Sequence, residues 1–304
     1  MATGNQPISS KSYWKKGQFV DEVIARQLRR GSVSLVIGAG ASFGFGLPSW
    51  EELVRRMYSA KGMPWPSGSI ILPRLSDSLR RMHFAKNDDG FARFVRECLF
   101  SSVKADASTV LSSKLLQALG ALIASSTRGR TGHLISFNFD DLLEVYLSSM
   151  GFLSRSVTIA PYMRATVDID VLHPHGLLPS NMTGQCSRLV FTELDYDRVI
   201  GKESEAWNRA MAGIMSSTTC IFIGLSGEDQ RLRTLLTDVQ LVHPILRSPH
   251  GHPYWGIRPT IKGEVTEVWE AWAERGVAAR QLQSYDDIPS WLFGICQLAA
   301  RLPP

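Results

Sequence analysis

Long apolar segments are absent from this 304-residue sequence. No run approaches the ~20 consecutive apolar residues that a membrane-spanning helix requires. Residues 1–30 also lack the uninterrupted apolar stretch of a secretory signal peptide. These two absences predict a cytoplasmic protein with no membrane attachment.

Cysteine is scarce as well. The four cysteines, Cys98, Cys186, Cys220 and Cys296, lie far apart and form no C-x-x-C pair. This spacing excludes a disulfide framework and a cysteine-based zinc module. We expect reduced thiols that are mostly buried.

Charge of one sign is only slightly in excess. Lys and Arg number 33 against 28 Asp and Glu, a formal net charge of +5. This mild excess favours anionic ligands such as nucleotides. The basic pairs Arg29–Arg30, Arg55–Arg56 and Arg80–Arg81 are isolated at helical positions, which is typical of solvated helix faces. Direct binding to nucleic acid is therefore not expected.

The sequence does contain short β-branched or apolar runs that alternate with amphipathic helical periods. A strand over 32–37 leads into a glycine cluster, and a capping box of Ser49 and Glu52 starts a helix at about Trp50. Further strands are predicted at 133–137, 156–160, 168–173, 188–192, 218–226, 252–257 and 278–285. This order predicts an α/β fold, a Rossmann-like doubly wound parallel sheet with a helical insertion at about 55–130, in a single domain over 1–304.

The first candidate site follows the first predicted strand and consists of Gly38, Ala39, Gly40, Ala41 and Ser42. Glycines at such a turn let backbone N–H groups approach a pyrophosphate near a helix N-terminus. The G-x-G-x-x-G fingerprint is incomplete, because Phe43 stands where its third glycine would be. A glycine turn made for steric reasons alone is the alternative.

The second candidate is Ser136-Phe137-Asn138-Phe139-Asp140-Asp141, between a predicted strand and a helix. The carboxyl ends of parallel strands face one crevice, so we expect Asn138 and Asp140 to share a space with the glycine segment. Asn and Asp also cap helices, so Asp140 or Asp141 could do only that.

Two more turns follow predicted strands. In His173-Pro174-His175-Gly176, a histidine with a pKa of about 6.5 suits a general base at neutral pH, and a hydrogen-bonded loop histidine is the alternative. A metal site is disfavoured there, because no cysteine or third histidine lies nearby in the sequence. In Gly224-Leu225-Ser226-Gly227-Glu228-Asp229, backbone N–H groups and a hydroxyl could meet a ribose or phosphate, or Ser226 and Asp229 could simply start a helix.

In this order the four turns resemble the sirtuin-like superfamily, and most closely its bacterial NAD-consuming branch, found in anti-phage defence effectors. GAGASFGFGLPSW is similar to that branch's G-A-G-x-S…G-L-P-x-W, SFNFDDLLE to T-x-N-Y-D-x-L-L-E, and HPHG to x-x-H-G. FIGLSGEDQRLRTLL is similar to F-(I/L)-G-x-S-x-x-D-x-x-(I/L)-R-x-(I/L)-L, and VFTELDYDRVI to an element that precedes it. The motifs span about 200 of the 304 residues.

The resemblance implies a role for each matched residue. Gly38, Gly40, Ala41 and Ser42, with Ala39 in the same loop, would hold the NAD pyrophosphate, and Gly224, Leu225 and Ser226 the adenosine half. Asn138 would position the nicotinamide ribose or the attacking water, and Asp140 would meet the nicotinamide carboxamide. His175 would be the base, with His173 as the fallback.

Two departures separate the sequence from deacylating sirtuins. Those enzymes place two C-x-x-C pairs for zinc between the H-G and G-(T/S)-S elements, whereas only Cys186 lies between His175 and Gly224. Their G-I-P-D-F-R is here Gly46-Leu47-Pro48-Ser49-Trp50-Glu51, without the arginine. Because the zinc module helps to form the acyl-lysine groove, its absence argues against protein deacylation and favours hydrolysis of NAD by water.

The resemblance therefore predicts a metal-independent NAD⁺ hydrolase that releases nicotinamide and ADP-ribose, as an NAD-depleting effector in bacterial anti-phage defence. Breaking the N-glycosidic bond gives an oxocarbenium-like centre, which needs a positioned polar group and a base. We expect a homo-oligomer and a separate activating partner, for example an ATPase-like or Argonaute-like protein, because no sensor domain is fused within the 304 residues. The alternatives are an NAD- or ADP-ribose-binding sensor module without turnover, and an NAD-dependent protein deacylase or ADP-ribosyltransferase.

Overall fold

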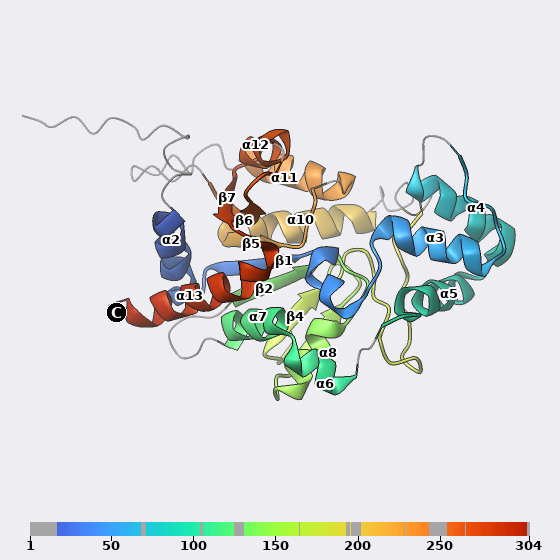
Figure 1. The fold of residues 1–304 in the computed structure, drawn as a ribbon, viewed down its shortest axis with the longest axis horizontal. Helices are drawn as coiled ribbons and strands as arrows, with labels where there is room; N and C mark the ends of the chain where they lie inside the picture. Colours follow the sequence, from blue (N-terminus) through green and yellow to red (C-terminus); the bar gives the residue numbers. More distant parts are fainter. Residues whose placement is uncertain are drawn as a thin grey trace, which may run out of the picture. The chain divides into compact units, whose positions relative to one another are not determined.

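The fold is described from a computed structural model (Figure 1). The structure describes residues 17–67, 71–103, 106–124, 131–163, 165–192, 195, 202–227, 229–242, 254–264 and 266–302. The chain divides into two compact units, each made of separate stretches of sequence. The first unit contains Met1–Val36, Gln117–His133 and Met211–Pro304, and the second contains Ile37–Leu116 and Leu134–Ala210. The single domain expected over 1–304 stays a prediction.

The strands form a seven-stranded sheet in the order β3-β4-β2-β1-β5-β6-β7. Their bounds are β1 Val33–Ile37, β2 Thr131–Ser136, β3 Ser154–Val157, β4 Ile169–Leu172, β5 Thr219–Ile223, β6 Gly256–Ile261 and β7 Val277–Leu282. The pairs β2–β4, β3–β4, β5–β6 and β6–β7 are all parallel. Parallel strands interleaved with helices confirm the predicted α/β, Rossmann-like fold class.

In the first unit, α2 (Gly17–Arg29) and α13 (Ile288–Arg301) lie side by side (Figure 1). Asp21 of α2 joins them to the sheet, because it accepts from Arg280 of β7 at 2.9 Å and from the Trp291 indole of α13 at 2.8 Å. Helices α11 (Gln230–Val242) and α12 (Thr266–Ala273) also belong to this unit, and α7 (Lys114–Ala124) and α10 (Lys202–Ser217) belong to it in part. Apolar strand residues supply its core; every residue of β1 is buried.

The helices predicted at about 55–130 are present. Between β1 and β2 the described elements are α3 Trp50–Ala60, α4 Leu72–Phe84, α5 Asp88–Phe100, α6 Ala107–Ser112 and α7 Lys114–Ala124. In this part of the chain, outside the undescribed residues 68–70, 104–105 and 125–130, there is no strand. Helices α3, α4 and α5 pack side by side (Figure 1). The predicted start of α3 is confirmed, since Ser49 Oγ accepts from Glu52 N at 3.3 Å.

One predicted strand is wrong. Residues 188–192 form no strand, because their backbone groups bond outside any ladder. Val190 N donates to His175 O at 2.9 Å, and Thr192 N donates to the Asp195 carboxylate at 3.1 Å. The strand expected at 252–257 begins only at Gly256, and residues 252–253 lie outside the described part of the chain.

Candidate functional site

Three predicted site residues meet in the second unit. Ser42 Oγ donates to Asp140 Oδ2 at 2.9 Å and accepts from Asn138 Nδ2 at 3.1 Å. All three residues are buried, with at most 8% of the surface exposed. One hydroxyl therefore joins the glycine segment to the loop after β2, as the position of both at strand ends predicts.

The ends of β1 and β2 bring these loops together. Phe137 N donates to Ile37 O at 2.8 Å, so the two chains are still paired where the strands finish. Asn138 N then donates to Ser136 Oγ at 3.3 Å, which turns the chain immediately after β2. Asn138 consequently lies beyond the carboxyl end of β2, beside Ser42, which follows the carboxyl end of β1.

The glycine segment itself forms a single 3₁₀ turn, η1, over Ala39–Ala41, rather than leading directly into an α-helix. Within it Ala41 N donates to Gly38 O at 2.9 Å and Ser42 N donates to Ala39 O at 3.0 Å. The first N–H groups of such a turn have no partner inside it. The amides of Ala39 and Gly40 therefore have no partner within this turn.

The carboxyl group of Asp140 has a raised pKa. Burial raises its pKa to about 6, against the opposing effect of the hydrogen bonds from Ser42 and from Leu142 N at 3.2 Å. Repulsion by Glu144 and Asp141 adds to the rise. Asp141 is the N-cap of α8 (Leu142–Ser149), and Asp140 bonds both the first amide of this helix and Ser42, so its role is not limited to the helix start.

The side chain of Asn138 has an acceptor oxygen, Oδ1, that is buried and forms no hydrogen bond with the described residues. Leaving such an atom unsatisfied costs about 1–3 kcal/mol. Buried polar atoms without a protein partner commonly meet water or a ligand, and Asn138 Oδ1 is a candidate for such a contact.

His173 is fully buried and both of its ring nitrogens are engaged. Nε2 lies 2.6 Å from Glu144 Oε1, and Nδ1 lies 3.3 Å from the backbone oxygen of Asn138. Burial lowers the pKa of His173, but Glu144, the Asn138 backbone oxygen and Asp140 together raise it more, so the net direction is upward. Burial raises the pKa of Glu144, but His173 and the Ser156 hydroxyl help to hold it below its usual range. A base needs a ring nitrogen open to substrate, so the fallback role of His173 is poorly supported.

His175 has different surroundings. It is 5% exposed, and its ring packs edge-on against Phe137, with centroids 5.1 Å apart, and near Phe139 at 6.3 Å. These two aromatic residues flank Asn138 in the sequence. Gly176 has a φ of +93°, and a Cβ there would overlap the backbone oxygen of Arg188. Packing of the chain is sufficient to explain this glycine.

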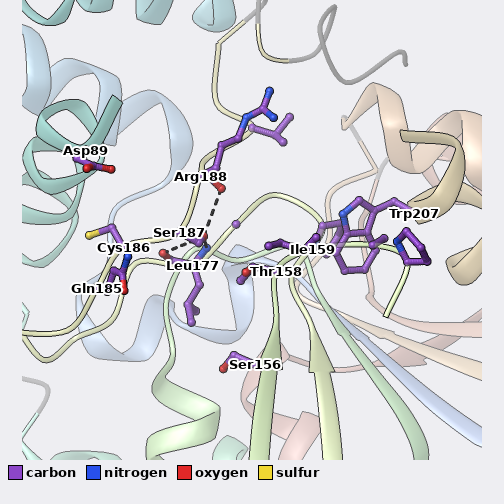
Figure 2. Close-up of a pocket in the computed structure, with 15 residues that line it drawn as sticks. Asp89, Ser156, Thr158, Ile159, Leu177, Gln185, Cys186, Ser187, Arg188 and Trp207 are labelled. Carbon is purple, nitrogen blue, oxygen red and sulfur yellow. Dashed lines mark hydrogen bonds between the residues drawn. The ribbon is translucent and has the colours of Figure 1, made fainter. Parts of the chain in front are cut away.

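A cavity of about 820 Å³ adjoins the histidine turn (Figure 2). Its wall includes Pro174 and Gly176, on either side of His175, and Ser156 at β3. The volume lies within the range of small-molecule sites. The described lining residues do not include Ser42, Asn138 or Asp140. The cavity therefore reaches the turn that carries His175 but stops short of the hydrogen-bonded cluster.

The second glycine turn belongs to the first unit. Asp229 caps α11, with Leu232 N donating to its Oδ1 at 2.7 Å, so the helix-start alternative is confirmed for this residue. A Cβ on Gly227, which has a φ of +82°, would lie 2.7 Å from Trp272 Nε1. Ser226 is exposed, and Glu228 lies outside the described residues. The adenosine-binding role of Gly224, Leu225 and Ser226 stays a prediction.

The cysteines and the membrane prediction have simple outcomes. All four cysteines are free; Cys98 and Cys220 are buried, and Cys186 and Cys296 are partly exposed. Among the residues that the structure describes, no group of three or more His, Cys, Asp or Glu is placed to hold a metal ion. None of the described helices is long and apolar enough to cross a membrane.

Glu144 is the last residue of the motif SFNFDDLLE, but sequence reasoning gave it no role. It is the one charged residue of α8, LLEVYLSS, and it lies beside apolar positions that pack into the protein. A single carboxylate on an otherwise apolar helix is the signal that could have found it, because a buried charge needs a partner. The partners are His173 and Ser156, whose hydroxyl donates to Glu144 Oε1 at 2.9 Å.

The sequence model of the SIR2-like domain matches residues 132–274, just under half of the chain. This segment is similar to SIR2-like domains. It contains Asn138, Asp140, His175 and the second glycine turn, and it begins after the Gly38–Ser42 segment. The match supports the resemblance to the sirtuin-like superfamily and does not distinguish the NAD-consuming defence branch.

No curated protein matches the sequence. The similar solved structures include that of a Sir2 homologue in complex with NAD. That chain shares 14% identity with this one, with a TM-score of 0.45, and the similarity covers 91% of this chain and 94% of that one. Similarity at this level assigns neither a ligand nor a reaction.

Proposed function

We propose that this protein is a sirtuin-like NAD⁺ hydrolase that cleaves the nicotinamide–ribose bond to give nicotinamide and ADP-ribose. The observation that carries the proposal is the buried cluster in which Ser42 bonds both Asn138 and Asp140. The cluster combines residues from two loops that the motif resemblance had assigned to one dinucleotide. The similarity of residues 132–274 to SIR2-like domains supports the same reading.

The cluster fits an N-glycosidic substrate. Asn138 Oδ1, which lacks a hydrogen-bond partner among the described residues, would accept from a ribose hydroxyl or from the attacking water. The Asp140 carboxylate would accept from the nicotinamide carboxamide, because each of its oxygens has a lone pair beyond the ones already used. The amides of Ala39 and Gly40 would face the pyrophosphate. Water then adds to the ribose carbon as nicotinamide leaves.

His175 is proposed as the base that takes the proton of this water. Its ring lies against Phe137 and Phe139, so it is anchored to the chain on both sides of Asn138. Pro174 and Gly176, the neighbours of His175 in the chain, line the cavity of about 820 Å³. The chemistry needs a positioned acceptor and a base, without a metal ion.

The biological role we propose is that of an NAD-depleting effector in bacterial anti-phage defence, which the motif resemblance supports. Uncontrolled NAD loss would harm the cell that makes the protein. We therefore expect self-assembly or a separate protein, such as an ATPase-like or Argonaute-like partner, to raise the activity above a basal rate that the purified protein shows alone.

The test is incubation of the purified protein with NAD, with and without an acyl-lysine peptide, followed by quantification of nicotinamide. We expect nicotinamide and ADP-ribose without peptide, and no loss of activity in EDTA. Binding of NAD with no product would favour the sensor alternative. Release that depends on the peptide would favour a deacylase or a transferase.

A further inference from the structure

We propose that His173 and Glu144 are positioning residues that hold Asn138 in its reactive orientation. The inference rests on the proposed function, since it assigns to these residues an effect on NAD cleavage. It concerns a buried pair that neither the motif resemblance nor the SIR2-like match explains.

The pair connects four elements of the second unit. His173 follows β4, Glu144 belongs to α8, and Ser156 of β3 donates to Glu144 Oε1 at 2.9 Å. His173 in turn lies 3.3 Å from the backbone oxygen of Asn138, after β2. The loop that carries Asn138 is thus tied through one imidazole to its neighbouring strands and helix.

The His173 ring can donate both of its hydrogen bonds only when both ring nitrogens carry a proton. The Asn138 backbone oxygen and the Glu144 carboxylate are both acceptors, and a neutral imidazole has only one N–H to offer. Two donated bonds need the imidazolium form, facing a carboxylate. The raised pKa of His173 and the lowered pKa of Glu144 agree with this charged arrangement.

The pair is better explained by geometry than by stability. Burying two charges is expensive, and apolar residues of similar size often stabilise a fold as well or better. The His173 ring is 0% exposed, and the Glu144 side chain only 11%. A charged pair in such a place fixes orientation, because each bond works at a defined angle and distance.

Asn138 is held at three points by these contacts. Its N–H donates to Ser136 Oγ, its backbone oxygen receives His173 Nδ1, and its side-chain Nδ2 donates to Ser42 Oγ. Among the described contacts, Oδ1 and the second N–H of Nδ2 are left for a ligand, and Oδ1 makes no hydrogen bond at all. Removing the His173 contact would let the peptide group of Asn138 rotate and move Oδ1 out of place.

Two substitutions separate the two bonds of the imidazole. In His173→Asn the amide nitrogen stands at the position of Nδ1, so the donor to Asn138 is kept and the bond to Glu144 is lost. In His173→Gln the amide nitrogen stands at the position of Nε2, so the bond to Glu144 is kept and the donor to Asn138 is lost. Steady-state nicotinamide release gives kcat and KM for each variant.

We expect His173→Gln to lower kcat by about 10²-fold, because small displacements of a reacting group cost that much. KM should change by less than about threefold, since the displaced group acts in the transition state. His173→Asn should keep at least about ten times more kcat than His173→Gln. Glu144→Gln, which keeps acceptors for Ser156 and His173 but removes the charge, should lower kcat by about tenfold.

The matched control is Thr131→Val. Thr131, at the start of β2, is buried and donates to a backbone oxygen, that of Leu122, at 3.1 Å. This variant also removes one buried side chain-to-backbone bond, and it should lower the unfolding temperature while leaving kcat unchanged. Thermal unfolding of every variant shows whether it is folded at the assay temperature.

Equal kcat values in His173→Gln and wild type, or equal losses in His173→Gln and His173→Asn, would overturn this inference. The proposed function would not be affected. If His173 variants do not fold, an unchanged kcat in Glu144→Gln overturns it, and a tenfold loss at constant KM supports it. Wild-type protein that releases no nicotinamide would overturn the proposed function, and the inference with it.

Discussion

The two glycine turns of this protein look alike in sequence and differ in how deeply their serines are buried. Ser42, after β1, is buried and bonds Asn138 and Asp140 from another loop. Ser226, after β5, is exposed, and the space at Gly227 beside it is filled by the Trp272 indole. A glycine–serine turn is therefore the stronger candidate for a reactive element where its serine is buried against polar groups of a second loop.

The largest effect on NAD cleavage is expected from substitution of Asn138, in the loop that meets the first glycine turn. Asn138→Ala should lower nicotinamide release by at least about 10²-fold, because it removes the unpartnered acceptor and the donor to Ser42. Circular dichroism and thermal unfolding should show a folded protein. Near wild-type turnover, or an unfolded variant, would favour a purely structural role for this turn.

His175→Ala should cost about 10²-fold or more and should remove the acid limb of the pH–rate profile, as loss of a general base does. His173→Ala should be slower than wild type but retain measurable turnover with that limb present. Parallel pH–rate profiles of the two variants make the comparison. If the acid limb is lost in His173→Ala and kept in His175→Ala, the base has been assigned to the wrong imidazole.

Replacing each of the two serines by alanine tests the comparison of the two turns directly. Ser42→Ala should lower kcat by about tenfold, because Asn138 and Asp140 lose the hydroxyl that joins them. Ser226→Ala should leave kcat within about twofold and act, where it acts, on KM. Steady-state kinetics of the pair checks this, and a reversed ranking would move the reactive site to the second turn.

The smallest expected effect is on stability, through the Asp140 carboxyl. Its pKa rises from 3.8 unfolded to about 6 in the fold, so between these values the folded state binds more protons, and stability falls as pH rises. Asp140→Asn removes the free-energy cost of ionising this buried carboxyl group. It should stabilise the protein by roughly 1 kcal/mol more at pH 8 than at pH 5.

Urea unfolding at the two pH values measures this difference. Asp238→Asn, which removes an exposed carboxylate from α11, is the control. A stabilisation by Asp140→Asn that is larger at pH 5 than at pH 8 would show that the buried carboxyl does not have the raised pKa.

The sequence was sufficient to predict the fold class, because its strands are short apolar runs with clear helical periods between them. It also predicted that Asn138 and Asp140 share a space with Ser42, since parallel strands place their carboxyl ends together. The strand expected at 188–192 failed, because apolar alternation does not reveal that Val190 bonds the His175 turn and Thr192 bonds Asp195.

The pairing of His173 with Glu144 was beyond prediction for a similar reason. The two residues are far apart in the chain, and only the register of β4 against its neighbours brings the imidazole to α8. Residue type alone made both histidines equal candidates for the base. Their different partners, a carboxylate for His173 and aromatic rings for His175, appear only in three dimensions.

Product analysis in ¹⁸O-labelled water tests the central claim most directly. The purified protein is incubated with NAD, with Asn138→Ala as the reference, and the products are identified by mass spectrometry. The account predicts nicotinamide together with ADP-ribose that carries one ¹⁸O atom, and neither product above background from the variant. Wild-type protein that leaves NAD intact, or that releases nicotinamide without labelled ADP-ribose, would contradict it.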